Sequence, residues 1–193
     1  MRFRLSGQLG AGALTFVLTA VLFVTAPATH ADQTDPRLGD LFVQLKSSES
    51  LGSAMTVERQ IWAIWSENER DEVNAEMVAG ARALQSRDWS RAIAAFSRVV
   101  ELAPEFAEGW NKRATAYYLA DQLDASVRDI HKTLSLEPRH FGALSGMGLI
   151  FLQQGDLGGA LMAFEQVLRV HPQSVPARQH VRELRARLRR GSV

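Results

Sequence analysis

The sequence predicts an all-α protein, a helical solenoid built from three successive helix pairs. Pro104, Pro138 and Pro172 are separated from one another by steps of 34 residues. Small and aromatic residues recur around these prolines with the same period and without an insertion. Self-similarity at this period is typical of solenoids whose repeats are helix–turn–helix units. Because one such unit cannot bury its apolar face alone, about three are needed for a stable array.

The bulk composition fits a modest globular domain and excludes several classes of function. The chain has 193 residues, of which 46% are hydrophobic, with 22 basic and 21 acidic side chains. This near-zero balance gives no general case for a nucleic-acid partner, whose recognition needs a concentrated basic face. The chain has no cysteine, which excludes disulfides and thiolate chemistry and fits an oxidising compartment.

Residues 1–31 have the composition of a secretory signal peptide. Two arginines lie in the first four residues, residues 9–26 are apolar and uncharged, and small residues follow Pro27 up to Ala31. We expect cleavage of this segment, and the alternative is an uncleaved anchor, because the apolar run approaches the roughly 18 residues that can span a bilayer. Both interpretations place the rest of the chain outside the cytoplasm, since the arginines hold the start inside.

Residues 32–72 are predicted to form two helices before the repeats. Apolar residues after Pro36 follow the spacing of one helix face, and Ser53 is expected to cap a second helix. The run from Ile61 to Trp65 covers more than one face of that helix and is therefore expected to be buried on several sides. We interpret the pair as a degenerate repeat that seals the first edge of the solenoid. The alternative is an exposed patch at residues 61–65 through which the protein docks a partner or self-associates.

The three repeats span residues 73–106, 107–140 and 141–174, followed by a segment from 175 to 193. Glycine, alanine, aromatic residues and proline recur at fixed positions, and these segments resemble the tetratricopeptide repeat (TPR) in its Trp-x2-Leu-Gly-x2-Tyr, Ala-x3-Phe and Pro pattern. The resemblance implies a right-handed α-solenoid that binds other proteins and has no enzymatic activity. The matching residues are Gly80, Ala92, Phe96 and Pro104 in the first repeat, Trp110, Ala114, Tyr117 and Pro138 in the second, and Gly148, Gly155, Ala160, Phe164 and Pro172 in the third.

Particular residues within the repeats have predictable structural roles. Gly80, Ala114 and Gly148 are expected to let the two helices of one repeat approach closely. Asp88 and Asp156 stand where the second helix of a repeat begins, and both are suited to N-capping. The prolines are expected to stop each second helix and to set the turn into the next repeat.

The resemblance also implies a concave groove, lined by the first helix of each repeat. Some TPR proteins clamp a partner's C-terminal carboxylate there with Lys and Arg, but at these positions only Lys112 supplies charge. We therefore expect a neutral, largely apolar groove that holds a helix or an extended peptide. The groove residues that the resemblance implies are Asn74, Met77, Ala81, Leu84 and Gln85, then Glu108, Asn111, Thr115, Tyr118 and Leu119, then Gly142, Ser145, Leu149, Leu152 and Gln153.

Residues 175–193 are predicted to form a last helix with an apolar side and many arginines. We interpret it as the solvated cap that a solenoid needs on its last face. The alternative is contact with anionic lipid headgroups or an acidic partner. The arginines are Arg178, Arg182, Arg185, Arg187, Arg189 and Arg190.

No motif in the sequence indicates catalysis, a cofactor or a metal. His131, His140, His171 and His180 show no HxH or HExxH spacing. His140 and His171 flank repeat-end prolines, where surface turn residues are expected. The glycines near Gly142 lie in a predicted helix and form no nucleotide-binding loop.

These observations lead to a non-catalytic protein–protein interaction scaffold as the first hypothesis. The chain looks like the small single-domain TPR proteins of Gram-negative envelopes, which implies a periplasmic location or an inner-membrane anchor with the repeats on the periplasmic side. One alternative is a self-associating structural protein whose groove is filled by its own helices. Another is association with a membrane surface through the arginine-rich helix.

Overall fold

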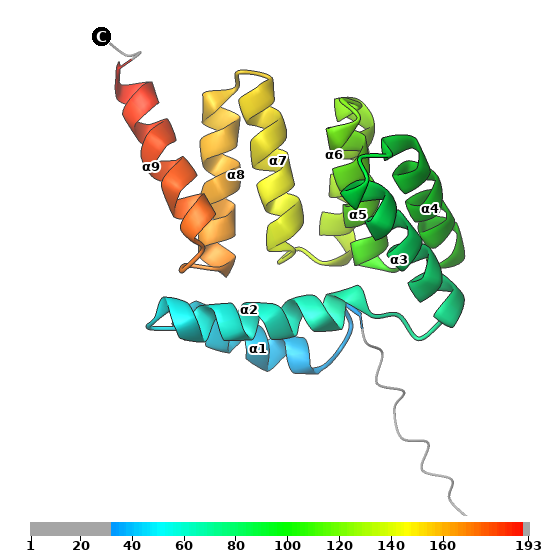
Figure 1. Ribbon diagram of the computed structural model, residues 1–193. Helices are drawn as coiled ribbons and strands as arrows, with labels where there is room; N and C mark the ends of the chain where they lie inside the picture. Colours follow the sequence, from blue (N-terminus) through cyan, green and yellow to red (C-terminus); the bar gives the residue numbers. More distant parts are fainter. Residues whose placement is uncertain (1–31, 191–193) are drawn as a thin grey trace, which may run out of the picture.

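The computed structural model describes residues 32–190, and within this range the chain folds into nine helices without strands. Helix pairs stand side by side and form a curved array, while a separate hairpin of helices lies across their ends (Figure 1). This confirms the predicted all-α solenoid. Across the described range, every helix is too short or too polar to cross a membrane. The predicted signal peptide lies outside the described residues.

Each repeat is one antiparallel helix pair, and successive pairs pack in chain order. The second helix of each repeat ends two residues before its proline, as at Leu102 and Pro104, which agrees with the predicted stop signal. The helices of the array are α3 (Asp71–Gln85), α4 (Trp89–Leu102), α5 (Ala107–Leu119), α6 (Leu123–Leu136), α7 (Phe141–Gln153), α8 (Leu157–Val170) and the terminal α9 (Val175–Arg190).

Close packing inside the first and third repeats explains Gly80 and Gly148. A Cβ atom added to Gly148 would lie 2.8 Å from the Phe164 ring, and one added to Gly80 would lie 2.5 Å from the Phe96 ring. Both phenylalanines are buried. Absence of a side chain at the two glycines therefore lets an aromatic ring fill the space between the two helices of a repeat.

Caps and turns recur with the period of the sequence. Asp88 accepts a hydrogen bond from the Arg91 amide and Asp156 accepts one from the Gly159 amide, which confirms both predicted N-caps. Inside each repeat, the turn between the two helices contains one residue in the left-handed region of backbone conformation. These residues are Arg87 (φ 59°), Asp121 (φ 59°) and Gly155 (φ 77°).

The N-terminal hairpin consists of α1 (Arg37–Ser47) and α2 (Leu51–Ser66). The prediction that Ser53 caps α2 is wrong. The cap is Ser50, which has an extended backbone and whose side chain accepts a hydrogen bond from the Ser53 amide.

The sequence interpretation expected the hairpin to continue the array next to α3 and to seal its first edge. The structure shows a different position. The hairpin lies across the ends of the later repeats, where α1 contacts α8 and α2 contacts α5 (Figure 1). Ile61 and Trp65 are 0% and 1% exposed and Trp62 is half-buried, so residues 61–65 do not form the continuous exposed patch that the alternative expected. Their side chains join one apolar core with residues of α7, α8 and α9, such as Phe164. Burial against these later helices decides where the hairpin lies.

Candidate functional site

A cleft of about 170 Å³ lies on the concave surface between α5 and α7. Besides Gly142, it brings together five of the predicted groove residues, which come from successive turns of the two helices. Their side chains offer one phenol, one amide and small or aliphatic groups, and none of them carries a formal charge. These residues are Asn111, Thr115, Tyr118, Ser145 and Leu149.

The first repeat does not extend this cleft. Met77 is buried in the core of its own repeat. Asn74 is held by the linker before α3, because its side chain accepts a hydrogen bond from the Asn68 amide at 3.0 Å and donates one to the Asn68 carbonyl at 2.7 Å. Ala81 and Gln85 are exposed and Leu84 is half-buried, and none of the three lines a described cleft.

The remaining predicted groove residues lie toward the ends of α5 and α7. Leu119 is exposed and Leu152 is half-buried. Gln153 donates a hydrogen bond to the Asp121 carboxylate at 2.7 Å, so its side chain joins two successive repeats.

A second cleft of about 410 Å³ continues the concave surface beneath the hairpin. Its walls come from α2, from the start of α7 and from the turn before α9. It shares Gly142 and Ser145 with the first cleft. Trp62 of α2 contacts this shared region so closely that a Cβ atom at Gly142 would lie 2.8 Å from the indole ring. The hairpin therefore covers one end of the groove partly and leaves the cleft beneath α2 open.

The one lysine expected to give the groove charge is engaged within the chain. Lys112 forms an ion pair with Glu108, with 3.0 Å between Nζ and Oε1. The same ammonium lies over the Trp62 ring, 5.6 Å from its centroid. Glu108, which the resemblance placed on the groove surface, is buried instead. The resulting groove has no free cation for a partner's carboxylate among these described residues.

A buried polar network lies behind the groove and centres on Glu108. His140 Nε2 lies 3.0 Å from Glu108 Oε2, and Asn111 donates to the same oxygen at 2.8 Å. His140 Nδ1 accepts a hydrogen bond from the Ala143 amide, so the imidazole carries its proton on Nε2 and donates to Glu108. Burial raises the pKa of Glu108, but the His140 hydrogen bond and the Lys112 charge outweigh it and hold that pKa below its ordinary value.

A second buried histidine connects the hairpin to the end of the third repeat. His171 Nε2 lies 3.3 Å from Glu58 Oε2 on α2. The His171 hydrogen bond lowers the pKa of Glu58, while burial opposes this change. His140 and His171 are 0% and 4% exposed, so their prediction as surface turn residues is wrong. Both lie where α2 covers the turns, as the contacts of His140 with Trp65 and of His171 with Glu58 show. Because α2 is far from both histidines in the chain, no local sequence signal indicated this burial.

The last helix covers α8 and turns most of its charge outward. Its apolar side, with Ala177, Val181 and Leu184, is buried, as expected of a cap. Two of the arginines have partners in the chain: Arg178 donates to the Pro172 carbonyl and Arg185 pairs with Glu165. Helical spacing of i, i+4, i+7 and i+11 places four arginines in one stripe along the helix. They are Arg178, Arg182, Arg185 and Arg189.

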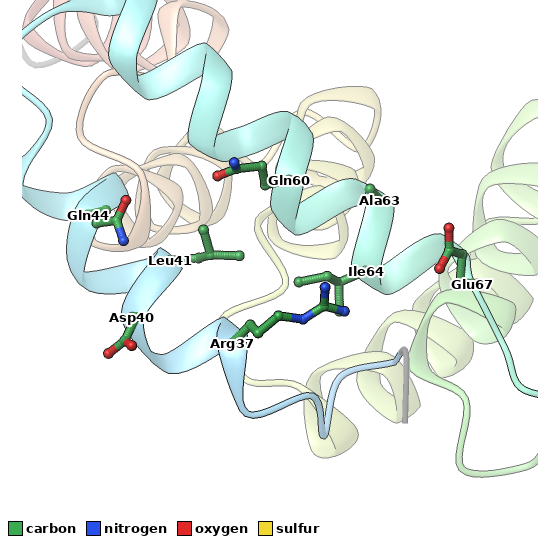
Figure 2. Close-up of a pocket in the computed structure, with 8 residues that line it drawn as sticks. All are labelled: Arg37, Asp40, Leu41, Gln44, Gln60, Ala63, Ile64 and Glu67. Atoms are coloured by element: carbon green, nitrogen blue, oxygen red, sulfur yellow. The ribbon is translucent and has the colours of Figure 1, made fainter. Parts of the chain in front are cut away.

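The outer side of the hairpin holds a further cleft of about 430 Å³ between α1 and α2. Figure 2 shows Arg37 extending from α1 toward Ile64 and Glu67 at the end of α2. Arg37 is already paired with the buried Asp35. The hydrogen bond from Arg37 lowers the pKa of Asp35, although burial acts in the opposite direction. Among residues 32–190, no cluster of three or more His, Cys, Asp or Glu side chains is placed to hold a metal ion.

The successive helix pairs and their concave surface define a helical-repeat solenoid. The sequence pattern of the tetratricopeptide repeat matches residues 78–130 and 112–176. A TPR repeat-containing protein of Rhizobium etli is 30% identical over 187 residues, which cover 91% of this chain and 90% of that protein. The chain belongs to the tetratricopeptide repeat family.

Solved structures show the same fold. The Sgt2 TPR domain from Aspergillus fumigatus superposes with a TM-score of 0.60 at 20% identity, over 64% of this chain and 83% of that domain. The second TPR domain of human RPAP3, in complex with the HSP70 peptide SGPTIEEVD, superposes with a TM-score of 0.55 at 21% identity, over 59% of this chain and 95% of that domain.

Proposed function

We propose that this protein is an exported, non-catalytic scaffold that holds an apolar segment of a partner protein in a composite groove. The composite groove consists of the cleft between α5 and α7 together with the cleft beneath α2. The observation that carries the proposal is that Gly142 and Ser145 line both clefts. The groove of the repeats is thereby continued by a wall that the hairpin supplies.

Exposed apolar side chains surround the second cleft and support this proposal. Leu51 and Met55 on α2 are 46% and 52% exposed, and Val175 at the start of α9 is 52% exposed. All three line the cleft beneath α2. Apolar side chains gathered around a cleft, rather than scattered singly, are typical of an interaction surface. Methionine suits such a surface because its flexible thioether adapts to different partner side chains.

The electrostatics of the groove favour an uncharged segment over an acidic tail. The human RPAP3 domain was solved with an HSP70 peptide that ends in EEVD, an acidic sequence. In the described part of this chain, the two clefts are lined by no lysine or arginine, and Lys112 is held by Glu108 and Trp62. An acidic peptide would lose its hydration there without gaining a countercharge. We therefore expect the partner to contribute aliphatic or aromatic side chains on a helix or an extended segment.

Site-specific photo-crosslinking tests the composite groove directly. A photoreactive amino acid is placed at Thr115 in the first cleft, at Met55 in the second, and at Val43 as the control. Val43 is 68% exposed on α1 and lines neither cleft. We expect the same partner to be crosslinked from Thr115 and Met55 and not from Val43. Equal crosslinking from Val43, or different partners at the two cleft positions, would contradict the composite groove.

Charge substitution provides a second test of the same surface. Tyr118→Glu and Leu149→Glu each place a carboxylate in the first cleft, and both are expected to reduce recovery of the crosslinked partner. Val43→Glu is the matched control, because it adds the same charge outside the groove. Unchanged recovery from both cleft variants would remove the groove from the mechanism.

The export part of the proposal is supported by the charged start, apolar centre and small-residue end of residues 1–31. We propose a location in the cell envelope, periplasmic or anchored on the periplasmic side. The mass of the chain recovered from cells tests cleavage, which is expected to follow Ala31. Fractionation of a Gram-negative host tests the location, and recovery of the full-length chain in the cytoplasm would contradict it.

A second candidate function is contact between α9 and an anionic membrane surface. Its support is the stripe of four arginines along α9, which would bring several guanidinium groups to one plane. Arg182→Gln with Arg189→Gln reduces this charge and leaves the contacts of Arg178 with the Pro172 carbonyl and of Arg185 with Glu165 in place. We expect the native chain to bind vesicles of phosphatidylglycerol in low salt and to release them in high salt, and the double variant to bind weakly. Binding that is unaffected by salt would contradict this function.

A further inference from the structure

A cleft larger than either of the two groove clefts lies on the convex side, opposite the groove. It occupies about 840 Å³ between α6 and α8, and α7 forms its floor. Three floor residues, Leu144, Met147 and Phe151, are only half-buried. At the mouth, Met162 is 65% exposed. Neither the sequence interpretation nor the proposed groove accounts for this surface.

The equivalent space between the first two repeats is filled. Arg113 of α5 lies there and forms a two-pronged ion pair with Asp129, with N–O distances of 2.7 and 2.9 Å. Its guanidinium also lies 4.8 Å from the Trp110 ring centroid and 5.6 Å from that of Tyr117. These side chains fill the first inter-repeat space and hold α5 against α6. We call the group of Arg113, Asp129, Trp110 and Tyr117 the clasp.

The repeat period explains why the second inter-repeat space is open. A shift of 34 residues exchanges the members of the clasp for smaller or uncharged side chains, and every replacement lines the convex cleft. Arginine becomes methionine, its carboxylate partner becomes a methyl group, and the large indole becomes an isobutyl group. The corresponding pairs are Arg113 and Met147, Asp129 and Ala163, Trp110 and Leu144, and Tyr117 and Phe151.

The lining defines the chemistry of an occupant. The floor is apolar, which suits a hydrocarbon chain, and a volume of this size is typical of small-molecule sites. Ionisable groups line the rim only along α6, where they are Asp124, Arg128 and His131. Asp124 lies in the first turn of α6, where the helix dipole stabilises its charge. Arg128 and the imidazole of His131 are then the groups placed to meet an anionic head.

We propose that the convex cleft binds a single-chain anionic amphiphile, with the chain along α7 and the head group at Arg128 and His131. A carboxylate head would accept hydrogen bonds from the Arg128 guanidinium in the geometry that arginine favours. The hydrocarbon chain would replace water along Leu144, Met147 and Phe151. The site is on the face opposite the groove and does not depend on the partner proposed there.

Titration calorimetry with dodecanoate, below its micelle concentration, tests the proposal on the folded chain. We expect saturable binding of one equivalent. Two variants close the cleft: Met147→Arg with Ala163→Asp, which rebuilds the clasp of the preceding repeat, and Ala163→Leu, which fills the cleft without charge. Both are expected to lower the affinity for dodecanoate by roughly tenfold or more, because they remove buried contacts with its methylene groups. The affinity for dodecanol must fall in parallel, because closing the cleft removes contacts with the hydrocarbon chain of the ligand and not with its head group.

The head group is tested separately with Arg128→Gln. This variant is expected to lower the affinity for dodecanoate several-fold and to leave the affinity for dodecanol unchanged. Equal changes in the two affinities would overturn the assignment of an anionic head group. Circular dichroism confirms that each variant is folded. Absence of saturable binding to the native chain, or native affinity in both closed variants, would overturn the site. Protection of the same residues by a captured protein, without binding of dodecanoate, would assign the cleft to a protein partner instead.

Discussion

The imidazole ring of His140 lies flat against the indole ring of Trp65, with 4.2 Å between the ring centroids and 9° between the planes. Trp65 belongs to α2, whereas His140 immediately precedes α7 and hydrogen-bonds Glu108 on α5. One side chain therefore joins the hairpin to two repeats. The residue lies at a turn by sequence and at the centre of a buried junction in space.

Removal of this imidazole is expected to be costly. His140→Ala should lower the free energy of unfolding by about 3 kcal/mol or more, because Glu108 then keeps a buried charge with Lys112 as its remaining ionic partner. Urea denaturation at neutral pH measures the effect. His131→Ala, at an exposed position of α6, is the control and should change stability by less than about 0.5 kcal/mol. Similar values for the two variants would contradict the structural role of His140.

The lowered pKa of Glu108 predicts a pH dependence of stability with a definite sign. A carboxyl whose pKa is lower in the folded state contributes stability that is present above the unfolded pKa of about 4.3. That contribution is lost as the pH falls through the lower folded pKa. We therefore expect the stability of the native chain to decline between about pH 5 and pH 3 more steeply than that of Glu108→Gln. Glu183→Gln, at an exposed position of α9, should keep the native slope, and identical slopes for all three proteins would contradict the prediction.

Two glycines in helices should respond to alanine with opposite signs. Gly148→Ala is expected to lower stability by about 1–3 kcal/mol, since the new methyl group would meet the Phe164 ring. Gly39→Ala, in α1, meets nothing within 4 Å and should raise stability by about 0.5–1 kcal/mol through helix propensity. Thermal or urea unfolding distinguishes the two results. Equal effects would show that close helix approach does not decide the first case.

The three inter-helix turns predict a stabilising substitution. Arg87 has a φ of 59°, a conformation that costs a residue with a side chain about 1 kcal/mol relative to glycine. Arg87→Gly should therefore stabilise the chain by up to about 1 kcal/mol, in line with the glycine at the equivalent position 155. Asp121→Gly should gain less, because aspartate tolerates this conformation and its carboxylate accepts a hydrogen bond from Gln153. A loss of stability in Arg87→Gly, measured by urea denaturation, would contradict this account.

The array was predictable because its signals are local. Prolines, capping aspartates and helix-contact glycines at a fixed period determine where helices end and how closely a pair packs, and each acts within one repeat. Asn111, Thr115 and Tyr118 were placed on one surface by the resemblance to the TPR family, and their i, i+4 and i+7 spacing on α5 agrees with that placement.

The position of the hairpin was not predictable in the same way. An apolar pattern at Ile61 and Trp65 shows that a helix must be buried, but it does not say against what. The answer depends on contacts with residues a hundred positions later, and the same contacts bury His140 and His171. The convex cleft was accessible in principle, since comparison of Arg113 with Met147 across one period reveals the missing clasp.

The hairpin also changes the order of events during folding. Most solenoid contacts join neighbouring repeats, yet Gln173 donates a hydrogen bond to the Ser48 carbonyl 125 residues away. Such long loops must close before the hairpin can be covered, which slows folding and favours a single cooperative transition over repeat-by-repeat melting. During synthesis, α2 is made before the helices that bury it. About a hundred further residues must follow before the apolar side chains that cover Ile61 and Trp65 are present. Until then the nascent chain exposes apolar side chains that are buried in the finished protein.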